Sequence, residues 1–162
     1  TGIERAKRFG TSLGMLMVDL DGFKEVNDAF GHHVGDMVLC ELSGRLSGAV
    51  RATDTVVRMG GDEFIILLPD LHAADEAEMI AAKIVAGAAI PIRVDEAPVS
   101  VTVSIGVATY PHDGSDEESL LRSADEAMYA AKQEGKNQLQ VYRPKSQAHN
   151  EPVFIGKSTG QR

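Results

Sequence analysis

Cysteine, tryptophan and aromatic residues in general are scarce or absent in this sequence. The 162 residues include one cysteine and no tryptophan, and aromatic residues make up 5% of the chain. A single cysteine, Cys40, allows neither a disulfide framework nor a cysteine-based zinc site, and we interpret it as a small apolar residue on a helix. The five histidines show no metal-ligand spacing with one another or with Cys40.

Long apolar runs and positive charge are also in short supply. Residues 13–20, LGMLMVDL, are too few to span a bilayer and include an acid, and no signal peptide is visible. The net charge is −8, whereas nucleic-acid-binding domains carry a basic surface. These observations predict a cytoplasmic domain that contacts neither a membrane nor nucleic acid, although its parent protein can be membrane-tethered.

The residues that are present are typical of a folded domain. Hydrophobic residues make up 43% and charged residues 25%, and the length suits one domain with its own core. Apolar periodicity predicts alternating helices and strands. Residues 5–10 are expected to be the end of a helix. Further helices are expected over 23–30, 34–50, 73–89 and 117–134, and strands over 13–20, 54–59, 64–69, 99–110 and 139–142.

Local signals support several of these elements. The run 99–110 alternates apolar with small or polar residues, which predicts a half-buried strand. Gly60-Gly61 is expected to turn the hairpin between 54–59 and 64–69. Ser115 and Glu118 have the spacing of a capping box at the start of the last helix.

The order of these elements predicts an α+β fold. A strand, a hairpin and further helix-separated strands fit a mixed or antiparallel sheet with a ferredoxin-like, split βαβ core. After Tyr142 no periodicity remains. We therefore expect one domain over residues 1–142, followed by a linker or disordered tail over residues 143–162.

Three acids lie where strands end. Asp19 closes the first strand, and Asp62 and Glu63 lie at the hairpin tip. If the first strand neighbours the hairpin, Asp19 and Asp62 converge, and two close carboxylates repel unless a cation lies between them. Oxygen ligands suit Mg²⁺ or Mn²⁺, which complete their shells with water and phosphate. The alternative is a surface hairpin with a solvated acidic turn.

The segment 19–36 carries further polar candidates. Asn27 and Asp36 are side chains that can meet the edge of a purine, since a carboxylate accepts from the two donors of guanine and an amide bonds either way. The alternative is an ordinary loop in which Asp36 caps a helix. Chemistry alone leaves both interpretations open.

Several linked motifs resemble one known family. GGDEF stands at residues 60–64, and DLDGFKEVND, GHHVGD, RATD, RMGGDEF, SIGVATYP and ADEAMYAAKQEGKN follow the order and spacing of GGDEF domains, the diguanylate cyclases, over residues 5–142. The resemblance implies a palm-like fold, as in nucleotide cyclases, with a central five-stranded sheet surrounded by helices. It also implies the condensation of two GTP molecules to cyclic di-GMP and two pyrophosphates by a catalytic homodimer, with two Mg²⁺ or Mn²⁺ ions per half-site.

The resemblance also implies roles for individual residues. Asp19, Asp62, Glu63 and the Leu20 carbonyl are the expected metal ligands, and Asp62 and Glu63 are the expected catalytic acids. The identity of the general base stays open between Asp62, Glu63 and a water. The expected substrate contacts are Phe23 through its backbone N–H, Lys24, Asn27, His32, Asp36, Gly60, Gly61, Lys132 and Lys136.

RATD, residues 51–54, falls where the family carries an inhibitory site for its product. Arg51 offers a planar fork for phosphate or for guanine, Asp54 accepts from guanine donors, and Arg58 is a further expected contact. These residues imply feedback inhibition by cyclic di-GMP. The alternative is an exposed salt bridge of little energetic consequence after a helix end.

The sequence departs from the family pattern in two places. The usual opening D-x-L-T-x-L-x-N-R is missing apart from Thr1-Gly2, so we expect a truncated N-terminal helix. Lys136 stands where arginine is commoner, which keeps the charge but loses bidentate geometry. Two other functions compete: a catalytically silent module that binds GTP or cyclic di-GMP and regulates an adjoining sensory or effector domain, and a different palm-like nucleotidyl cyclase or polymerase.

Overall fold

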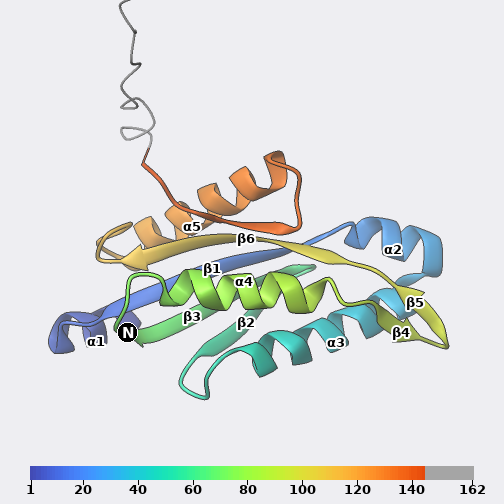
Figure 1. The fold of residues 1–162 in the computed structure, drawn as a ribbon, viewed down its shortest axis with the longest axis horizontal. Coiled ribbons are helices and arrows are strands. Elements are labelled where there is room, and N and C mark those ends of the chain that lie inside the picture. Colours follow the sequence, from blue (N-terminus) through green and yellow to red (C-terminus); the bar gives the residue numbers. More distant parts are fainter. Residues whose placement is uncertain (145–162) are drawn as a thin grey trace, which may run out of the picture.

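A five-stranded sheet with the strand order β2-β3-β1-β6-β7 organises residues 1–144, the part of the chain that the computed structural model describes (Figure 1). β1 (Ser12–Asp21) lies at the centre, antiparallel to β3 (Glu63–Leu71) and β6 (Thr102–Tyr110). β2 (Thr55–Gly60) pairs with β3 at one edge, and β7 (Gln138–Val141) runs parallel to β6 at the other. The predicted α+β fold with a mostly antiparallel five-stranded sheet is confirmed.

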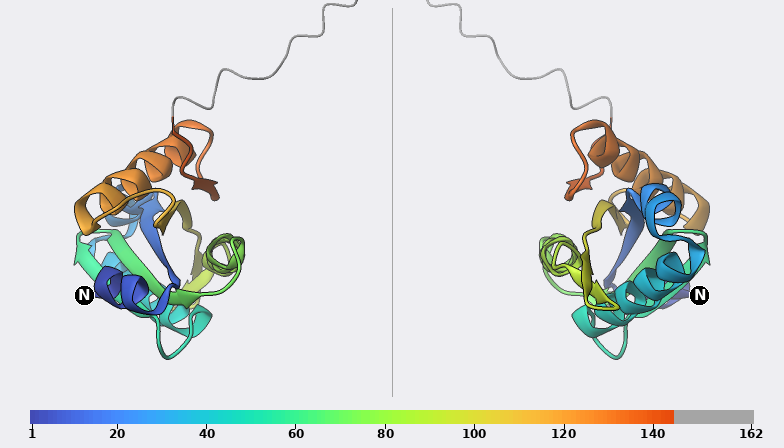
Figure 2. Two further views of the ribbon diagram at one scale, coloured as in Figure 1. Left: turned by 90° about the vertical axis from the view of Figure 1, so that its left-hand side faces the viewer. Right: turned by 90° about the vertical axis from the view of Figure 1, so that its right-hand side faces the viewer.

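Helices cover both faces of this sheet (Figure 2). α3 (His32–Ala49) and α4 (Glu76–Ala88) lie on one face, and α5 (Glu117–Gln133) and the short α1 (Gly2–Phe9) lie on the other. α2 (Phe23–Phe30) connects the end of β1 to α3. Of the helices in residues 1–144, none is both long and apolar enough to cross a bilayer.

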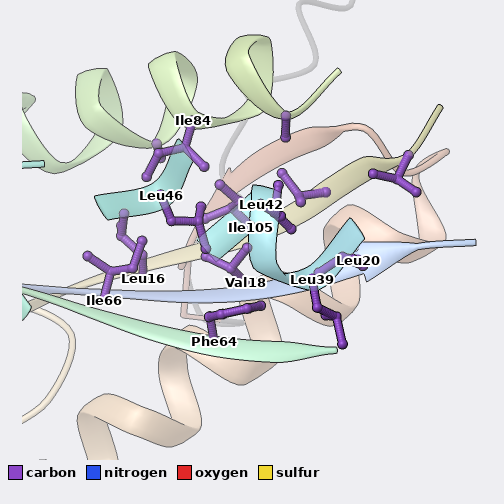
Figure 3. Packing of buried hydrophobic residues seen from close by; sticks show 14 of the residues in the cluster. Leu16, Val18, Leu20, Leu39, Leu42, Leu46, Phe64, Ile66, Ile84 and Ile105 are labelled. Atoms are coloured by element: carbon purple, nitrogen blue, oxygen red, sulfur yellow. The ribbon is translucent and has the colours of Figure 1, made fainter. Parts of the chain in front are cut away.

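The period-2 alternation of β1 divides its apolar side chains between two cores. Leu16, Val18 and Leu20 are buried against α3 and α4 (Figure 3), whereas Met15 and Met17 are buried against α5. Because both faces of β1 are covered, its sequence is a nearly continuous apolar run. The polar side chains at its carboxyl end are therefore exceptions that need a separate explanation.

One glycine sets the distance between α5 and the sheet. A Cβ atom at Gly106 of β6 would overlap the Ala124 carbonyl and the Met128 amide of α5. The helix backbone therefore rests directly on the strand, which a larger residue would prevent. This close packing fixes the carboxyl-terminal turn of α5, where Lys132 lies, relative to the end of β1.

The predicted single strand over 99–110 is interrupted in the structure. β5 (Ala97–Val99) pairs with β4 (Ile92–Val94) in a separate two-stranded hairpin, and β6 begins only at Thr102. Asp95 and Glu96 turn this hairpin with φ angles of 47° and 69°. β4 was not predicted because it is a three-residue strand with no alternation long enough to recognise.

Two local predictions are wrong. The N-cap of α5 is Asp116, whose side chain accepts a hydrogen bond from the Ser119 amide while the Asp116 amide donates to Ser119 Oγ, so Ser115 and Glu118 do not form the capping box. The hairpin turn is also shifted by one residue: β2 includes Gly60, and Gly61 and Asp62 connect it to β3.

The ends of the described chain bear on two further expectations. α1 has eight residues, and Thr1 and Glu4 form a reciprocal capping box at its start. The helix packs Ile3 and Ala6 against the sheet, and the expected truncation of a longer N-terminal helix stays a prediction. The predicted tail over residues 143–162 lies outside the described residues from position 145 onward.

Candidate active site

The register of the sheet brings the three predicted acids to one end. Asp19 of β1 is the cross-strand partner of Glu63, and the Leu20 amide donates to the Asp62 carbonyl at 3.2 Å. β1 therefore neighbours the hairpin, as the convergence of these acids requires. Asp62 is half-buried in the turn, whereas Glu63 is exposed at the start of β3.

The glycines of the signature shape the turn that carries Asp62. Gly60 and Gly61 have φ angles of 137° and 56°, and a Cβ atom at either would point into open space. A positive φ rather than crowding therefore explains both glycines. Arg58 donates two hydrogen bonds, of 2.9 and 2.7 Å, to the Gly61 carbonyl, so its guanidinium holds the signature turn.

Asp19 is half-buried and less compensated than the buried acid Asp21. Its Oδ1 atom is buried and has no hydrogen-bond partner, and Lys132 Nζ lies 3.5 Å from its Oδ2 atom. Burial raises the pKa of Asp19 to about 6, and the carboxylates of Asp62 and Glu63 add to this effect against the opposing charge of Lys132. A carboxylate oxygen of this kind fits a divalent cation, which would supply the missing partner.

The oxygen donors of this site suit a cation, although they do not surround a single position. Among residues 1–144, no group of three or more His, Cys, Asp or Glu side chains is arranged to enclose a metal ion. Mg²⁺ is usually held by one or two carboxylates and otherwise by water and substrate phosphates. Asp19 and Asp62, with the adjacent Leu20 carbonyl, provide a donor set of that size and type.

Asp21 is a functional candidate that the sequence reasoning missed. It is 8% exposed and accepts hydrogen bonds from Thr102, Ser104, Lys132 and the Asn137 amide. Although burial acts to raise it, these hydrogen bonds lower the pKa of Asp21. The signal was available in the sequence, because side chains two positions apart on a strand share a face, and Asp21 therefore lies beside Asp19.

The predicted phosphate-binding lysines lie near these acids, at and beyond the end of α5. Lys132 Nζ donates to Asp21 Oδ1 at 2.7 Å and to the Leu20 carbonyl at 3.0 Å. The Leu20 carbonyl that was expected to bind a metal therefore accepts from Lys132 in this structure. Lys136 is exposed in the loop before β7 with a φ angle of 63°.

The residues predicted to recognise the guanine base, Asn27 and Asp36, lie on either side of the bend between α2 and α3. This bend, residues 27–36, is the α2–α3 elbow. Asn27 of α2 packs against Gly35 of α3, and a Cβ atom at Gly35 would overlap the Asn27 side chain. Asn27 Oδ1 is buried without a hydrogen-bond partner and so retains its capacity to accept a hydrogen bond. Asp36 follows Gly35 and is exposed. Gly31 is the N-cap of α3, which rules out the alternative that Asp36 caps the helix.

A groove of about 430 Å³ borders Asp36. It lies between α3 and β4, and its lining residues are His33, Asp36, Met37, Cys40, Glu41, Ile92, Arg93 and Val94. Cys40 lies on a helix as predicted, but it is exposed in this groove rather than packed in the core. His32 and Lys24 are also exposed, and Phe23 is the first residue of α2, where a backbone N–H has no partner within the helix.

The predicted inhibitory cluster lies at the other end of the hairpin. Arg51 donates to Asp54 Oδ1 at 3.0 Å and to the Pro69 carbonyl at 3.0 Å, and it lies 3.8 Å from Glu76. Asp54 raises the pKa of Arg51 through this hydrogen bond. The structure thus brings Arg51 and Asp54 together, whereas Arg58 is bound to the signature turn.

Comparison with known proteins connects this arrangement to one family. The model of the diguanylate cyclase GGDEF domain matches residues 1–138. The chain is 44% identical over 135 residues to the bifunctional diguanylate cyclase/cyclic di-GMP phosphodiesterase MucR of Pseudomonas aeruginosa, covering 83% of this chain and 20% of MucR. It is 41% identical over 138 residues to the response regulator PleD of Caulobacter vibrioides, covering 83% of this chain and 30% of PleD.

Solved structures agree with this relationship. The crystal structure of the GGDEF domain of TpbB (YfiN) from Pseudomonas aeruginosa matches with a TM-score of 0.86 and 38% identity, covering 88% of this chain and 89% of that chain. The chain therefore belongs to the GGDEF domain family of diguanylate cyclases. It spans between a fifth and a third of the length of MucR and PleD, so these relatives contain further regions.

Proposed function

We propose that this domain is a catalytically competent diguanylate cyclase that condenses two GTP molecules to cyclic di-GMP and two pyrophosphates. The observation that carries the proposal is the buried, unpartnered Oδ1 atom of Asp19, in the same carboxylate cluster as Asp62 and Glu63. A protein that only needed a stable hairpin would not retain an uncompensated acid at the end of its central strand.

The residues of the candidate active site would have separate roles in phosphoryl transfer. Asp19, Asp62 and the Leu20 carbonyl would hold Mg²⁺ or Mn²⁺, two ions per half-site with GTP. When bound, such ions supply Lewis-acid stabilisation of the phosphates and lower the pKa of the attacking hydroxyl. Lys132 and Lys136 would orient the triphosphate and neutralise its charge, since positioning and electrostatics are the protein's main contributions to this reaction.

The chemical step is an in-line displacement repeated twice. The 3′-oxygen of one GTP attacks the α-phosphorus of the other, the bond from that phosphorus to the pyrophosphate oxygen breaks, and the 3′-proton leaves to a base. Glu63 is exposed, so it would be accessible to a nucleotide held by a second domain. Each domain contributes one GTP, so a homodimer is needed for both bonds.

Base selection rests on the α2–α3 elbow. Asp36 would accept from the N1–H and N2–H₂ donors of guanine, and the Asn27 amide would bond the same base from the buried side of the elbow. The unpartnered Asn27 Oδ1 atom supports this assignment. Adenine offers an acceptor at N1 in place of a donor, so it would leave Asp36 without its main partner.

Feedback inhibition completes the proposal. Cyclic di-GMP would bind at Arg51 and Asp54, with Arg58 joining only if it leaves the Gly61 carbonyl. Because Arg51 already bonds Asp54 and the Pro69 carbonyl, the cluster is preorganised for a planar ligand edge. The region outside this chain would supply the sensory or effector domains that control dimer formation.

Product analysis tests the proposal. The purified domain, at high protein concentration, is incubated with GTP and Mg²⁺, and in parallel with ATP. Cyclic di-GMP from GTP, and no cyclic dinucleotide from ATP, is the expected result. A domain that binds GTP or cyclic di-GMP but forms no product, even when fused to a dimerising partner, would instead be the silent regulatory module.

A further inference from the structure

The acids Asp19 and Asp21 share a face of β1 but have opposite surroundings. Each oxygen of Asp21 accepts two hydrogen bonds: Oδ1 accepts from Ser104 Oγ and Lys132 Nζ, both at 2.7 Å. Oδ2 accepts from Thr102 Oγ1 at 2.7 Å and from the Asn137 amide at 2.9 Å. Asp19 Oδ1, by contrast, has no partner.

This saturation excludes Asp21 from a cation-binding role. A carboxylate oxygen has two lone-pair sites, and all those of Asp21 are occupied by protein donors. Recruiting Asp21 as a ligand would require breaking bonds to β6, to α5 and to the loop after it. A carboxylate with this many partners is instead suited to fixing the groups that donate to it.

Two of those donors belong to the segment that carries the candidate phosphate contacts. Lys132 has a flexible four-carbon stem, and its ammonium group is held by Asp21 and by the Leu20 carbonyl. The bond to the Asn137 amide fixes the residue after Lys136, in a loop where Lys136 and Asn137 have φ angles of 63° and 48°. Left-handed backbone in non-glycine residues persists only where its surroundings hold it.

We infer that Asp21 is a positioning residue that holds Lys132 and the Lys136 loop in place for the triphosphate of GTP. Thr102 and Ser104 of β6 fix the carboxylate, and the carboxylate fixes the lysine and the loop. This inference rests on the proposed function, because it assumes that the nucleotide bound beside Asp19 is GTP. Asp21 therefore has a different role from Asp19, the other acid in the sequence Asp-Leu-Asp at residues 19–21.

Binding of nucleotides without turnover tests the inference. The affinities of 3′-deoxy-GTP and 3′-deoxy-GMP, which lack the attacking hydroxyl, are measured by calorimetry in Mg²⁺ with the wild-type domain and with Asp21→Asn. We expect the variant to bind 3′-deoxy-GTP about tenfold more weakly, the cost of a charge-assisted contact that is no longer held. The affinity for 3′-deoxy-GMP should stay the same, because it has no β- and γ-phosphates.

A double-mutant cycle separates positioning from general stability. If Asp21 acts through Lys132 as well as through the Lys136 loop, Asp21→Asn should weaken the binding of 3′-deoxy-GTP less in the Lys132→Ala background than in the wild type. Asp113→Asn is the matched control, because Asp113 is 9% exposed and accepts from Thr109 and His112 at the opposite end of β6. It should lower the melting temperature and leave both affinities unchanged.

The outcomes distinguish the inference from the function on which it rests. Equal losses for the triphosphate and the monophosphate, or additive effects in the cycle, would overturn the positioning role while leaving the cyclase intact. A wild-type domain with no affinity for 3′-deoxy-GTP would overturn both. If Asp21→Asn does not fold, Thr102→Val/Ser104→Ala removes the two hydroxyl anchors instead, and an unchanged ratio of the two affinities would refute the inference.

Discussion

Acids lie at both ends of the central sheet, and the two ends treat them differently. At the end where β1 begins, Asp70 bonds Arg5 at 2.8 Å and Thr11, Asp54 bonds Arg51, and Asp113 accepts from Thr109. At the end where β1 finishes, Asp19 retains a buried oxygen without any partner. At the first end these carboxylates have partners within the protein, whereas the second end keeps a carboxylate that is costly to bury.

The presence or absence of partners for the carboxylates locates the site better than the presence of acids does. A count of carboxylates would not separate the two ends, because each has several. Lys132 lies 3.5 Å from Asp19 but only 2.7 Å from Asp21, so its ammonium group compensates Asp21 more than Asp19. The remaining negative charge at Asp19 is what a divalent ion would neutralise.

Removing an acid from the uncompensated end should have the largest effect. Asp62→Ala is expected to lower the rate of cyclic di-GMP formation by about 10²–10³-fold or more, the range found when a group that stabilises transition-state charge is lost. The rate is measured by chromatographic product analysis. Asp70→Asn, at the compensated end, is the control and should turn over GTP at the wild-type rate; unchanged activity in Asp62→Ala would refute the assignment.

The Arg51 cluster gives the next largest expected effect. Arg51→Ala should raise the concentration of cyclic di-GMP needed for half-inhibition by about tenfold or more, since it removes a charged, bidentate contact. Uninhibited turnover should remain, because Arg51 bonds Asp54 and Pro69 rather than the signature turn. Inhibition curves for wild type and variant are compared, and a wild-type enzyme that its product does not inhibit would contradict the site.

The same substitution at the two ends should change stability in opposite directions. Asp19→Asn removes a charge whose burial raises its pKa to about 6, so the metal-free domain should melt about 2–4 °C higher at pH 7, equivalent to about 1 kcal/mol after discounting for solvent screening. Asp70→Asn loses the Arg5 pair and should melt slightly lower. Calorimetry without divalent ions measures both; a lower melting temperature for Asp19→Asn would mean that this end is compensated after all.

The smallest expected effect is the pH dependence of the Arg5–Asp70 pair. The hydrogen bond from Arg5 lowers the pKa of Asp70. The folded state therefore binds this proton less readily than the unfolded state, so the pair stabilises the domain above the ordinary aspartate pKa and loses its contribution as the pH falls through the lowered value. Denaturant melts of wild type and Arg5→Met should differ slightly at neutral pH and converge in acid; a difference that grows in acid would contradict the sign.

The backbone of the acid site follows from the sequence, because apolar runs and turn residues are local signals. Apolar runs bounded by Asp21-Gly22 and by Gly60-Gly61 predicted β1 and the hairpin, and their pairing places Asp19 opposite Glu63. The linked motifs then predicted the elbow residues Asn27 and Asp36. These features depend on local pattern and on strand order, both of which a sequence displays.

The side-chain network could not be predicted in the same way. Thr102 lies 81 positions from Asp21, and the Asn137 amide lies 116 positions away, so no local signal links them. Arg58 was expected at the inhibitory cluster, yet it bonds Gly61 only three residues further on. Which of several possible acceptors a long cationic side chain selects depends on its rotamer and on packing, which periodicity does not determine.

The uncompensated Asp19 at the end of β1 would bind a divalent cation together with the nucleotide. Mn²⁺ binding, followed by electron paramagnetic resonance in the presence of 3′-deoxy-GTP, tests it most directly in wild type, Asp19→Asn and Asp70→Asn. We predict protein-dependent Mn²⁺ binding in wild type and Asp70→Asn that is lost or strongly weakened in Asp19→Asn. Equal Mn²⁺ affinity in all three proteins would contradict this role of Asp19 in cation binding.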